Sequence, residues 1–136
     1  MIKKMKYLLL ITLLFIFSCA ENNPVNNLNG ILSKYEGIYQ GKGKKESIYY
    51  GTSEEKDITL IVNKDSSVIF KSDFLEFIFD NISKIDDKSY FSMKNESNSL
   101  LIFSMTFDGN ENVNVSLIIQ EADEKYTADK LTKKVY

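Results

Sequence analysis

Histidine, arginine and tryptophan are missing from this chain of 136 residues, and cysteine and proline occur once each. Without histidine, Ser-His-Asp and Cys-His catalysis, histidine-ligated zinc and histidine pH switching are all excluded. The single cysteine, Cys19, leaves no partner for a disulfide or for a Cys-x-x-Cys metal or redox site. A glycosidase-like pair of acids would still be available. We nevertheless expect no enzyme, no cofactor and no metal site.

All positive charge comes from lysine. The chain has 17 lysines against 19 acidic residues, a net charge of −2. Three of these lysines, Lys3, Lys4 and Lys6, lie in the first 18 residues, so removal of that segment leaves 14 against 19, a net charge of −5. Phosphate recognition relies on clustered positive charge. An acidic chain without arginine is therefore not expected to bind nucleic acid.

The N-terminus has the order of a signal peptide. Its three lysines are followed at once by an apolar run over residues 7–17, which stops at Ser18 and Cys19 before a polar, asparagine-rich stretch. A transmembrane helix is the competing interpretation. Spanning a bilayer takes about 20 apolar residues, and the run is shorter than that.

The segment Ile16-Phe17-Ser18-Cys19 resembles the lipobox of bacterial lipoproteins. Ile16 and Ser18 fit the pattern, whereas Phe17 is larger than the residue usual at its position, so the match is to a relaxed lipobox. The resemblance implies cleavage before Cys19 and attachment of several acyl chains there, which together give stable membrane attachment. It also implies a place in the bacterial cell envelope, and we favour the outer membrane or cell surface over the inner membrane.

These signals divide the chain into three parts. Residues 1–18 are expected to be the signal peptide, residues 19–30 a lipidated flexible tether, and residues 31–136 one small domain. Where the tether leads into that domain, Leu28, Ile31, Leu32 and Tyr35 recur at helical spacing. They predict a short helical turn that plugs one end of a sheet.

Beyond Tyr35 the sequence is typical of strands. Alternating or aromatic-rich runs predict them at 37–41, 47–50, 57–63, 67–71, 74–79, 82–85, 90–93, 100–107, 112–120 and 126–131. The strongest hairpin signal is Asp108-Gly109 between two alternating runs. We predict an all-β fold, an antiparallel meander of about seven to nine short strands forming a small closed or nearly closed barrel.

The opening Gly37-Ile38-Tyr39 resembles the glycine-x-aromatic start of the first strand in lipocalin-like small barrels. That resemblance implies the meander topology and, as an alternative function, a carrier of a small apolar ligand.

Two local motifs have simpler explanations. Residues 108–112 match the opening of a calcium loop but then lack its glycine and its last carboxylate, so we expect a hairpin turn. Residues 41–45 suggest a phosphate loop but lack its ending, so we expect a solvated loop.

Aromatic residues outnumber what so small a barrel can bury. The run of residues 74–79 is apolar on both faces, so either both faces are covered or one offers a patch to a ligand or partner. The expected binding surface consists of Phe74, Phe77, Phe79, Tyr49 and Tyr50. We therefore predict a lipid-anchored, non-catalytic binding module for a protein, glycan or apolar ligand. The alternatives are a lipocalin-like carrier and an inhibitor of an envelope-directed hydrolase.

Overall fold

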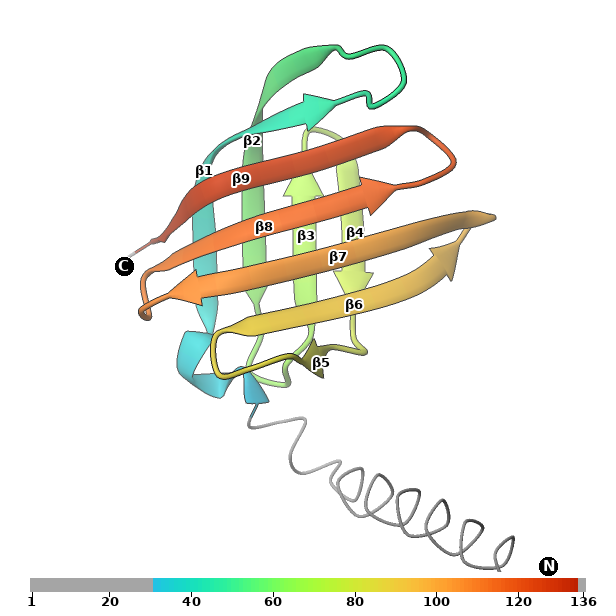
Figure 1. The fold of residues 1–136 in the computed structure, drawn as a ribbon. Helices are drawn as coiled ribbons and strands as arrows, with labels where there is room; N and C mark the ends of the chain where they lie inside the picture. The colour runs from blue at the N-terminus through green and yellow to red at the C-terminus, as the bar shows by residue number, and fades with distance from the viewer. Residues whose placement is uncertain (1–30, 135–136) are drawn as a thin grey trace, which may run out of the picture.

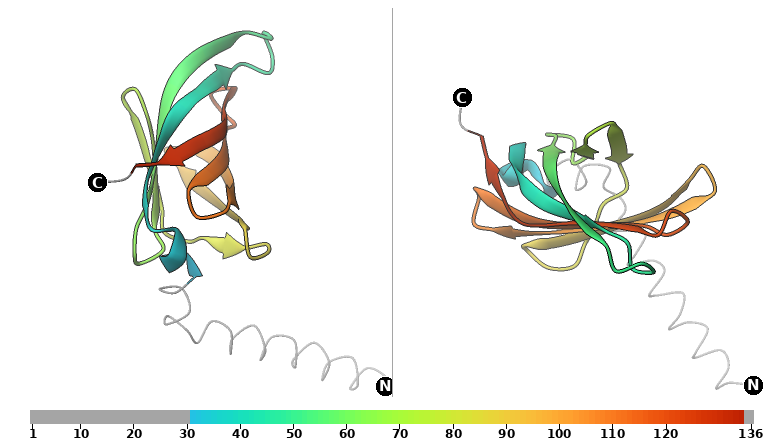
Figure 2. Two further views of the ribbon diagram at one scale, coloured as in Figure 1. Left: turned by 90° about the vertical axis from the view of Figure 1, so that its left-hand side faces the viewer. Right: turned by 90° about the horizontal axis from the view of Figure 1, so that it is seen from above.

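The computed structural model describes residues 31–134, which form one antiparallel sheet of nine strands and a short 3-10 helix, η1 (Ser33–Tyr35). The strands are β1 (Gly37–Glu46), β2 (Ser53–Val62), β3 (Val68–Ser72), β4 (Leu75–Phe79), β5 (Ser83–Lys84), β6 (Ser89–Glu96), β7 (Ser99–Asp108), β8 (Asn112–Ile119) and β9 (Glu124–Lys133). The sheet curls strongly into a half-barrel, in which strands β1 to β4 run steeply across strands β6 to β9 (Figures 1 and 2). The predicted all-β meander with a short N-terminal helical turn is confirmed.

Strand β1 makes the corner between the two layers. It pairs with β2 on one edge and with β9 on the other, the one neighbour in the sheet that is not consecutive in the chain. The register between β1 and β9 shifts between Gln40 and Lys44, and Gly43 lies in this irregular stretch. A Cβ atom on Gly43 would overlap the Thr127 carbonyl oxygen and the Ile58 side chain. Glycine therefore lets the bent strand lie close against its neighbours.

The opposite corner is open. The sheet ends at β4 on one side and at β5 on the other, and no backbone hydrogen bonds join these edges within the described chain. Side chains bridge the gap: the Lys94 amino group donates to the Ile78 carbonyl oxygen. The Phe79 ring stacks on Phe103 with 4.6 Å between ring centroids. The half-barrel is thus held together at this corner by side chains, not by backbone pairing.

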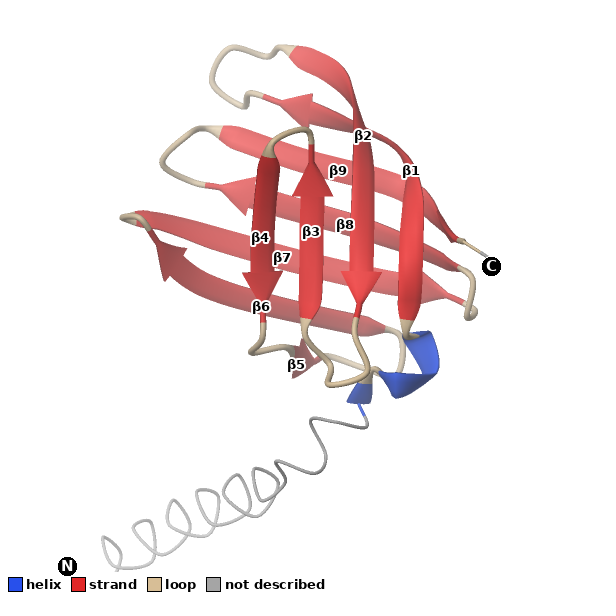
Figure 3. Cartoon of the chain, turned by 180° about the vertical axis from the view of Figure 1, so that it is seen from behind, coloured by secondary structure: helices blue, strands red, loops and turns tan. Residues whose placement is uncertain are grey.

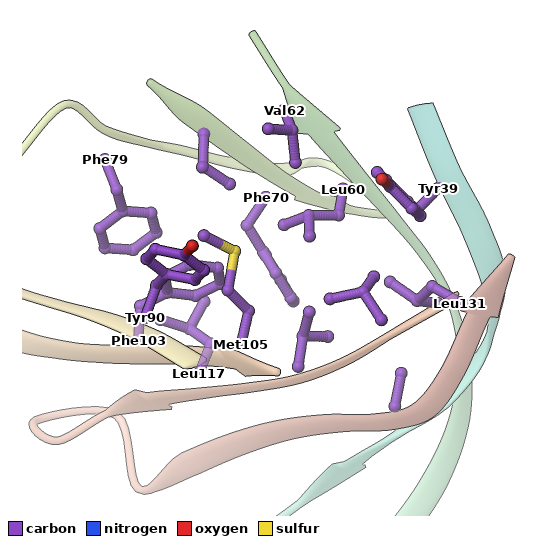
Figure 4. Close-up of a cluster of buried hydrophobic side chains, with 14 of the residues drawn as sticks. Tyr39, Leu60, Val62, Phe70, Phe79, Tyr90, Phe103, Met105, Leu117 and Leu131 are labelled. Carbon is purple, nitrogen blue, oxygen red and sulfur yellow. The ribbon is translucent and has the colours of Figure 1, made fainter. Parts of the chain in front are cut away.

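Apolar side chains fill the interior between the layers. Along β7, the buried residues Leu101, Phe103, Met105 and Phe107 alternate with more exposed ones, because successive residues of a strand point to opposite faces. Figure 4 shows how side chains from the two layers meet in this core. The labelled residues are Tyr39, Leu60, Val62, Phe70, Phe79, Tyr90, Phe103, Met105, Leu117 and Leu131.

The short helical turn closes one end of the half-barrel. The Tyr35 ring stacks on Phe107 with 3.9 Å between ring centroids, and its hydroxyl donates to the Asp87 carbonyl oxygen at 2.8 Å. Leu32 is fully buried, and its backbone N–H donates to the Ser66 hydroxyl. The turn therefore acts as the plug that its apolar spacing predicted. Leu28 lies outside the described residues.

Two segments have a different structure from the one predicted. Residues 47–50, expected as a strand, form the turn between β1 and β2, because Gly51 with a φ of +65° reverses the chain there. Residues 41–45, expected as a solvated loop, lie inside β1, since both glycines serve the bend of that strand. Tyrosine favours strands, which led to the strand predicted at 47–50, and glycine disfavours them, which led to the loop predicted at 41–45. In the folded sheet, contacts with neighbouring strands override both preferences.

Candidate binding surface

Four turns lie at the end of the half-barrel away from η1, and we call three of them the rim (Figures 1 and 3). These three are residues 47–52 between β1 and β2, residues 73–74 between β3 and β4, and residues 120–123 between β8 and β9. Two of the three carry exposed aromatic side chains. The rim is therefore the part of the described chain with the clearest surplus of apolar surface.

The turn between β1 and β2 presents three large apolar side chains to solvent. Ile48, Tyr49 and Tyr50 have exposed fractions of 68%, 82% and 77%. The two tyrosine rings meet edge to face with 4.9 Å between centroids. The backbone beneath them is ordered by hydrogen bonds, since the Gly51 N–H donates to the Ser47 carbonyl oxygen at 2.9 Å. The tyrosines are thus exposed on a defined turn.

Asp123 fastens this turn to the one between β8 and β9. Its carboxylate accepts the Ser47 hydroxyl at 2.5 Å and the Tyr49 backbone N–H at 3.0 Å. The Ser47 hydrogen bond, followed by the backbone donors, lowers the pKa of Asp123 below its usual range. Two turns far apart in the sequence are therefore joined by one ionised side chain.

Phe74 stands alone at the tip of the turn between β3 and β4. Its exposed fraction of 103% means that no other part of the described chain covers it. The preceding residue, Asp73, has a φ of +52° and accepts a hydrogen bond from the Lys56 amino group at 2.6 Å. This ion pair connects the turn to β2, and the turn lies at the same end of the molecule as the turn between β1 and β2 (Figure 3).

The other two residues of the predicted surface point inward from β4. Phe79 is fully buried against Phe103, so the expectation that it helps form an exposed surface is wrong for this residue. Phe77 is partly buried and packs against the core. Both residues share the inner face of β4 with Leu75, because residues two apart in a strand point the same way. The predicted surface therefore divides into three rim residues and two residues of the interior.

A layer of charged side chains separates the rim from the core. Lys45 and Lys56 lie on the inner faces of β1 and β2, where Lys45 pairs with Glu124 at 3.3 Å and Lys56 with Glu54 at 3.2 Å. The Tyr126 hydroxyl donates to the second oxygen of Glu124 at 3.2 Å. Burial, with the adjacent Glu124 carboxylate, raises the pKa of Tyr126, so this hydroxyl stays protonated.

Beside Tyr50 the rim encloses a solvent-open hollow of about 320 Å³. Its walls come from the turns at residues 47–52 and 120–123 and from the adjacent ends of β1, β2 and β9. A larger hollow, of about 680 Å³, lies on the outside of the corner where β1 meets β2 and β9. Most residues that line the two hollows are polar or charged.

Sequence reasoning missed several exposed apolar residues. Ile48 was overlooked because its segment was expected to be a strand, although Gly51 directly after the tyrosines could have indicated a turn. Phe91 and Met93 lie on the outer face of β6, with exposed fractions of 37% and 52%, and Ile78 on β4 is solvent-exposed as well. The alternation of β6 around the buried Tyr90 and Ser92 could have identified them.

Cys19, the predicted lipid-attachment residue, lies outside the described residues. Among residues 31–134, no helix has the length and apolar character needed to cross a membrane. In the same span no group of three or more acidic, cysteine or histidine side chains is placed to hold a metal ion. A scan against protein-family models and searches of curated proteins and of solved structures find no match to this chain.

Proposed function

We propose that this chain is a lipid-anchored, non-catalytic binding module of the bacterial cell envelope, and that it contacts a protein partner through the rim. The observation that carries the proposal is the exposure of Tyr49, Tyr50 and Phe74 on turns whose backbones are tied to neighbouring elements. Tyrosine and phenylalanine are enriched where proteins bind one another.

The amount of exposed aromatic surface supports this proposal. An aromatic side chain has about 150 to 250 Å² to bury. Tyr49 and Tyr50, which meet on one turn, together with Ile48 of the same turn, therefore present apolar area comparable to the largest patch of a typical monomer, which is about 300 to 600 Å². Leaving that area in water is unfavourable, so a partner that covers it gains free energy.

The direction in which the rim points also fits an anchored module. The described chain starts at Ile31, at the end closed by η1, and the rim lies at the other end (Figure 1). Eleven residues lie between Cys19 and Ile31, and the extended chain from one to the other spans about 40 Å. A lipid at Cys19 would therefore leave the rim free to face away from the anchoring membrane.

The packed interior counts against the lipocalin-like carrier. A carrier needs a cavity of about 300 Å³ or more that shields its ligand. The space between the layers is taken by buried side chains, whereas the hollows described above open to solvent. A binding module needs no interior space. An inhibitor of a hydrolase would be one form of such a module, with an enzyme as its partner.

Photo-crosslinking in living cells tests the use of the rim. We would place a photoreactive amino acid at Tyr50 of the full chain and, as a control, at Ile85, another exposed apolar residue, beside β5 at the other end. We expect discrete protein adducts from position 50 and none from position 85. Adducts from position 85 alone, or from neither position, would contradict the proposal.

The anchor is tested by the variant Cys19→Ser. Acyl chains contribute about 0.8 kcal/mol per buried methylene, so their loss should release the protein from membranes. Detergent partitioning of cell fractions measures the result, with the unmodified chain as the reference. A Cys19→Ser protein that still enters the detergent phase would show that lipid at Cys19 is not the anchor.

A further inference from the structure

The rim turns carry charge of one sign only. They contain Asp73, Glu121 and Asp123 and no lysine. The connections at the closed end, residues 31–36, 63–67, 80–88 and 109–111, instead mix four lysines with six acidic residues. These lysines are Lys34, Lys64, Lys84 and Lys88. The rim turns, which include the one with the exposed tyrosines, thus offer carboxylates and no amino group of their own.

We propose that the rim binds a lysine- or arginine-bearing segment of a protein partner. This inference rests on the proposed function, because it takes the rim to be the contact surface and adds the chemistry of what docks there. The face of an aromatic ring attracts a cation placed within about 6 Å of its centroid. Exposed tyrosines bordered by carboxylates therefore complement a partner that offers basic side chains.

The charges around the rim hollow support a basic partner. Four carboxylates line the hollow, against one amino group, that of Lys45. They belong to Glu46, Glu54, Asp123 and Glu124. Four against one leaves an excess of three negative charges around the hollow. Long-range attraction from such an excess raises association rates with a positively charged surface.

Glu46 is the carboxylate best placed for direct contact. It lines the hollow together with Tyr50, at the end of β1. Glu54 and Glu124 each pair with a lysine, and Asp123 is engaged by Ser47 and Tyr49, whereas Glu46 forms no ion pair within the described part of the chain. A basic side chain entering beside Tyr50 would therefore meet an available carboxylate.

A membrane surface is the main rival occupant, since tyrosine and isoleucine also favour the bilayer interface. Binding at anionic lipid is usually assisted by lysine or arginine next to the inserted residues. The rim turns have acidic residues in those places. The charge pattern thus favours a basic protein segment over a lipid headgroup layer.

Peptide binding tests the inference on the full chain purified in detergent. The probes are a peptide of alternating glycine and lysine, the corresponding arginine peptide, and a glycine and glutamate peptide of equal length. We expect both basic peptides to bind at low salt, with an affinity that falls as salt is added, and the acidic peptide not to bind. Binding of the acidic peptide, or of zwitterionic or anionic vesicles in place of the basic peptides, would overturn the inference.

Variants locate the binding. Tyr49→Ala combined with Tyr50→Ala should weaken the basic peptides about fivefold or more, the loss expected for one or two cation–π contacts. Glu46→Gln should weaken them too, whereas Glu76→Gln, at an exposed acid on the outer face of β4, should not. Equal effects of Glu46→Gln and Glu76→Gln would show a general attraction to an acidic protein and overturn the inference.

The two proposals fail in different ways. If crosslinks from position 50 persist while neither basic peptide binds, the rim is a contact surface and its partner is not basic. If no crosslinks form at position 50, the proposed function itself is wrong, whatever the peptides do.

Discussion

Phe74 and Phe79 are five positions apart in the chain, and the fold gives them opposite surroundings. Phe74 lies in a turn and is fully exposed, whereas Phe79 ends β4 on its inner face and is fully buried. Nothing in the apolar sequence of residues 74–79 distinguishes the two phenylalanines. Which residues face inward depends on where the turn falls, and a shift of one residue exchanges the two faces.

These two residues should respond differently to truncation. Phe79→Ala removes a ring stacked on Phe103 and should lower the free energy of unfolding by about 3 to 5 kcal/mol. Phe74→Ala, its matched control, touches no packed side chain and should change it by less than about 0.5 kcal/mol. Urea unfolding followed by circular dichroism measures both values. A large loss for Phe74→Ala would mean that this ring packs against its own chain.

Gly43 should tolerate no side chain. Gly43→Ala places a Cβ against the Thr127 carbonyl oxygen and Ile58, so we expect a loss of about 3 kcal/mol in unfolding free energy, or failure to fold. The control is Gly51→Asn, since the Gly51 position is open and asparagine accepts a positive φ. Thermal unfolding of the two variants gives the comparison. Equal stability would show that the corner adapts to a larger residue.

At the scale of elements, the hairpins were the most predictable part. The Asp108-Gly109 pair does connect two paired strands, since Asp108 ends β7 and Gly109 begins the turn to β8. Gly109 adopts a left-handed conformation there, with a φ of +68°. Alternation identified β2, β7 and β8 because one face of each is buried. The rim turn at residues 47–52 was missed, since tyrosine favours strands and local sequence does not show that the rings have no neighbour to cover them.

The link between two of the rim turns should depend on Asp123. Asp123→Ala removes the acceptor for Ser47 and Tyr49, so hydrogen exchange at the Tyr49 amide should quicken while the strands remain protected. Glu121→Ala, in the same turn, is the matched control and should leave that amide unchanged. Mass spectrometry of peptides after hydrogen exchange measures the protection of this segment in both variants. Unchanged protection in Asp123→Ala would show that the turn is ordered by its own hydrogen bonds.

The same link should weaken in acid. The pKa of Asp123 is lowered in the folded state, so its contribution is present above the usual carboxyl pKa and is lost as pH falls through the lowered value. Exchange at the Tyr49 amide, corrected for the intrinsic effect of pH, should therefore rise only in strongly acidic solution. A change near neutral pH would point to a different group.

On the scale of the whole molecule, buried tyrosines should set the alkaline limit of stability. Burial, with the neighbouring Tyr35, raises the pKa of Tyr39 and of Tyr90 to about 12, compared with 10.0 for a free side chain. The unfolded chain therefore loses these protons first as pH rises. Stability should be constant below about pH 10 and fall between about 10 and 12.

Urea unfolding between pH 8 and pH 12 tests this window. Tyr39→Phe removes one of the buried hydroxyls, along with its 2.6 Å hydrogen bond to the Tyr35 carbonyl oxygen, so it should lower stability at pH 8 and flatten the alkaline decline. A decline of unchanged steepness in Tyr39→Phe would assign the effect to other groups.

The overall closure was the least predictable feature. The all-β meander follows from the number and spacing of alternating runs, but the pairing of β1 with β9 joins residues that no local pattern relates. The side-chain bridge from Lys94 to Ile78 at the open corner is equally invisible in the sequence. The rim combines turns from three separate hairpins, so neither its composition nor its sign of charge could be assembled without the fold.

The pairing of β1 with β9 has a consequence for the order in which the domain can form. A chain made from its N-terminus can pair β2 with β3 and β3 with β4 early. The second edge of β1 stays unpaired until β9, a strand of ten residues, has been made. Closing a loop over nearly the whole domain is slow compared with forming a hairpin. A product that ends before Glu124 would leave β1 and β8 each with an unpaired edge, and such edges associate with other chains. The half-barrel is therefore complete only once β9 has been made, and a shorter product stays incompletely folded.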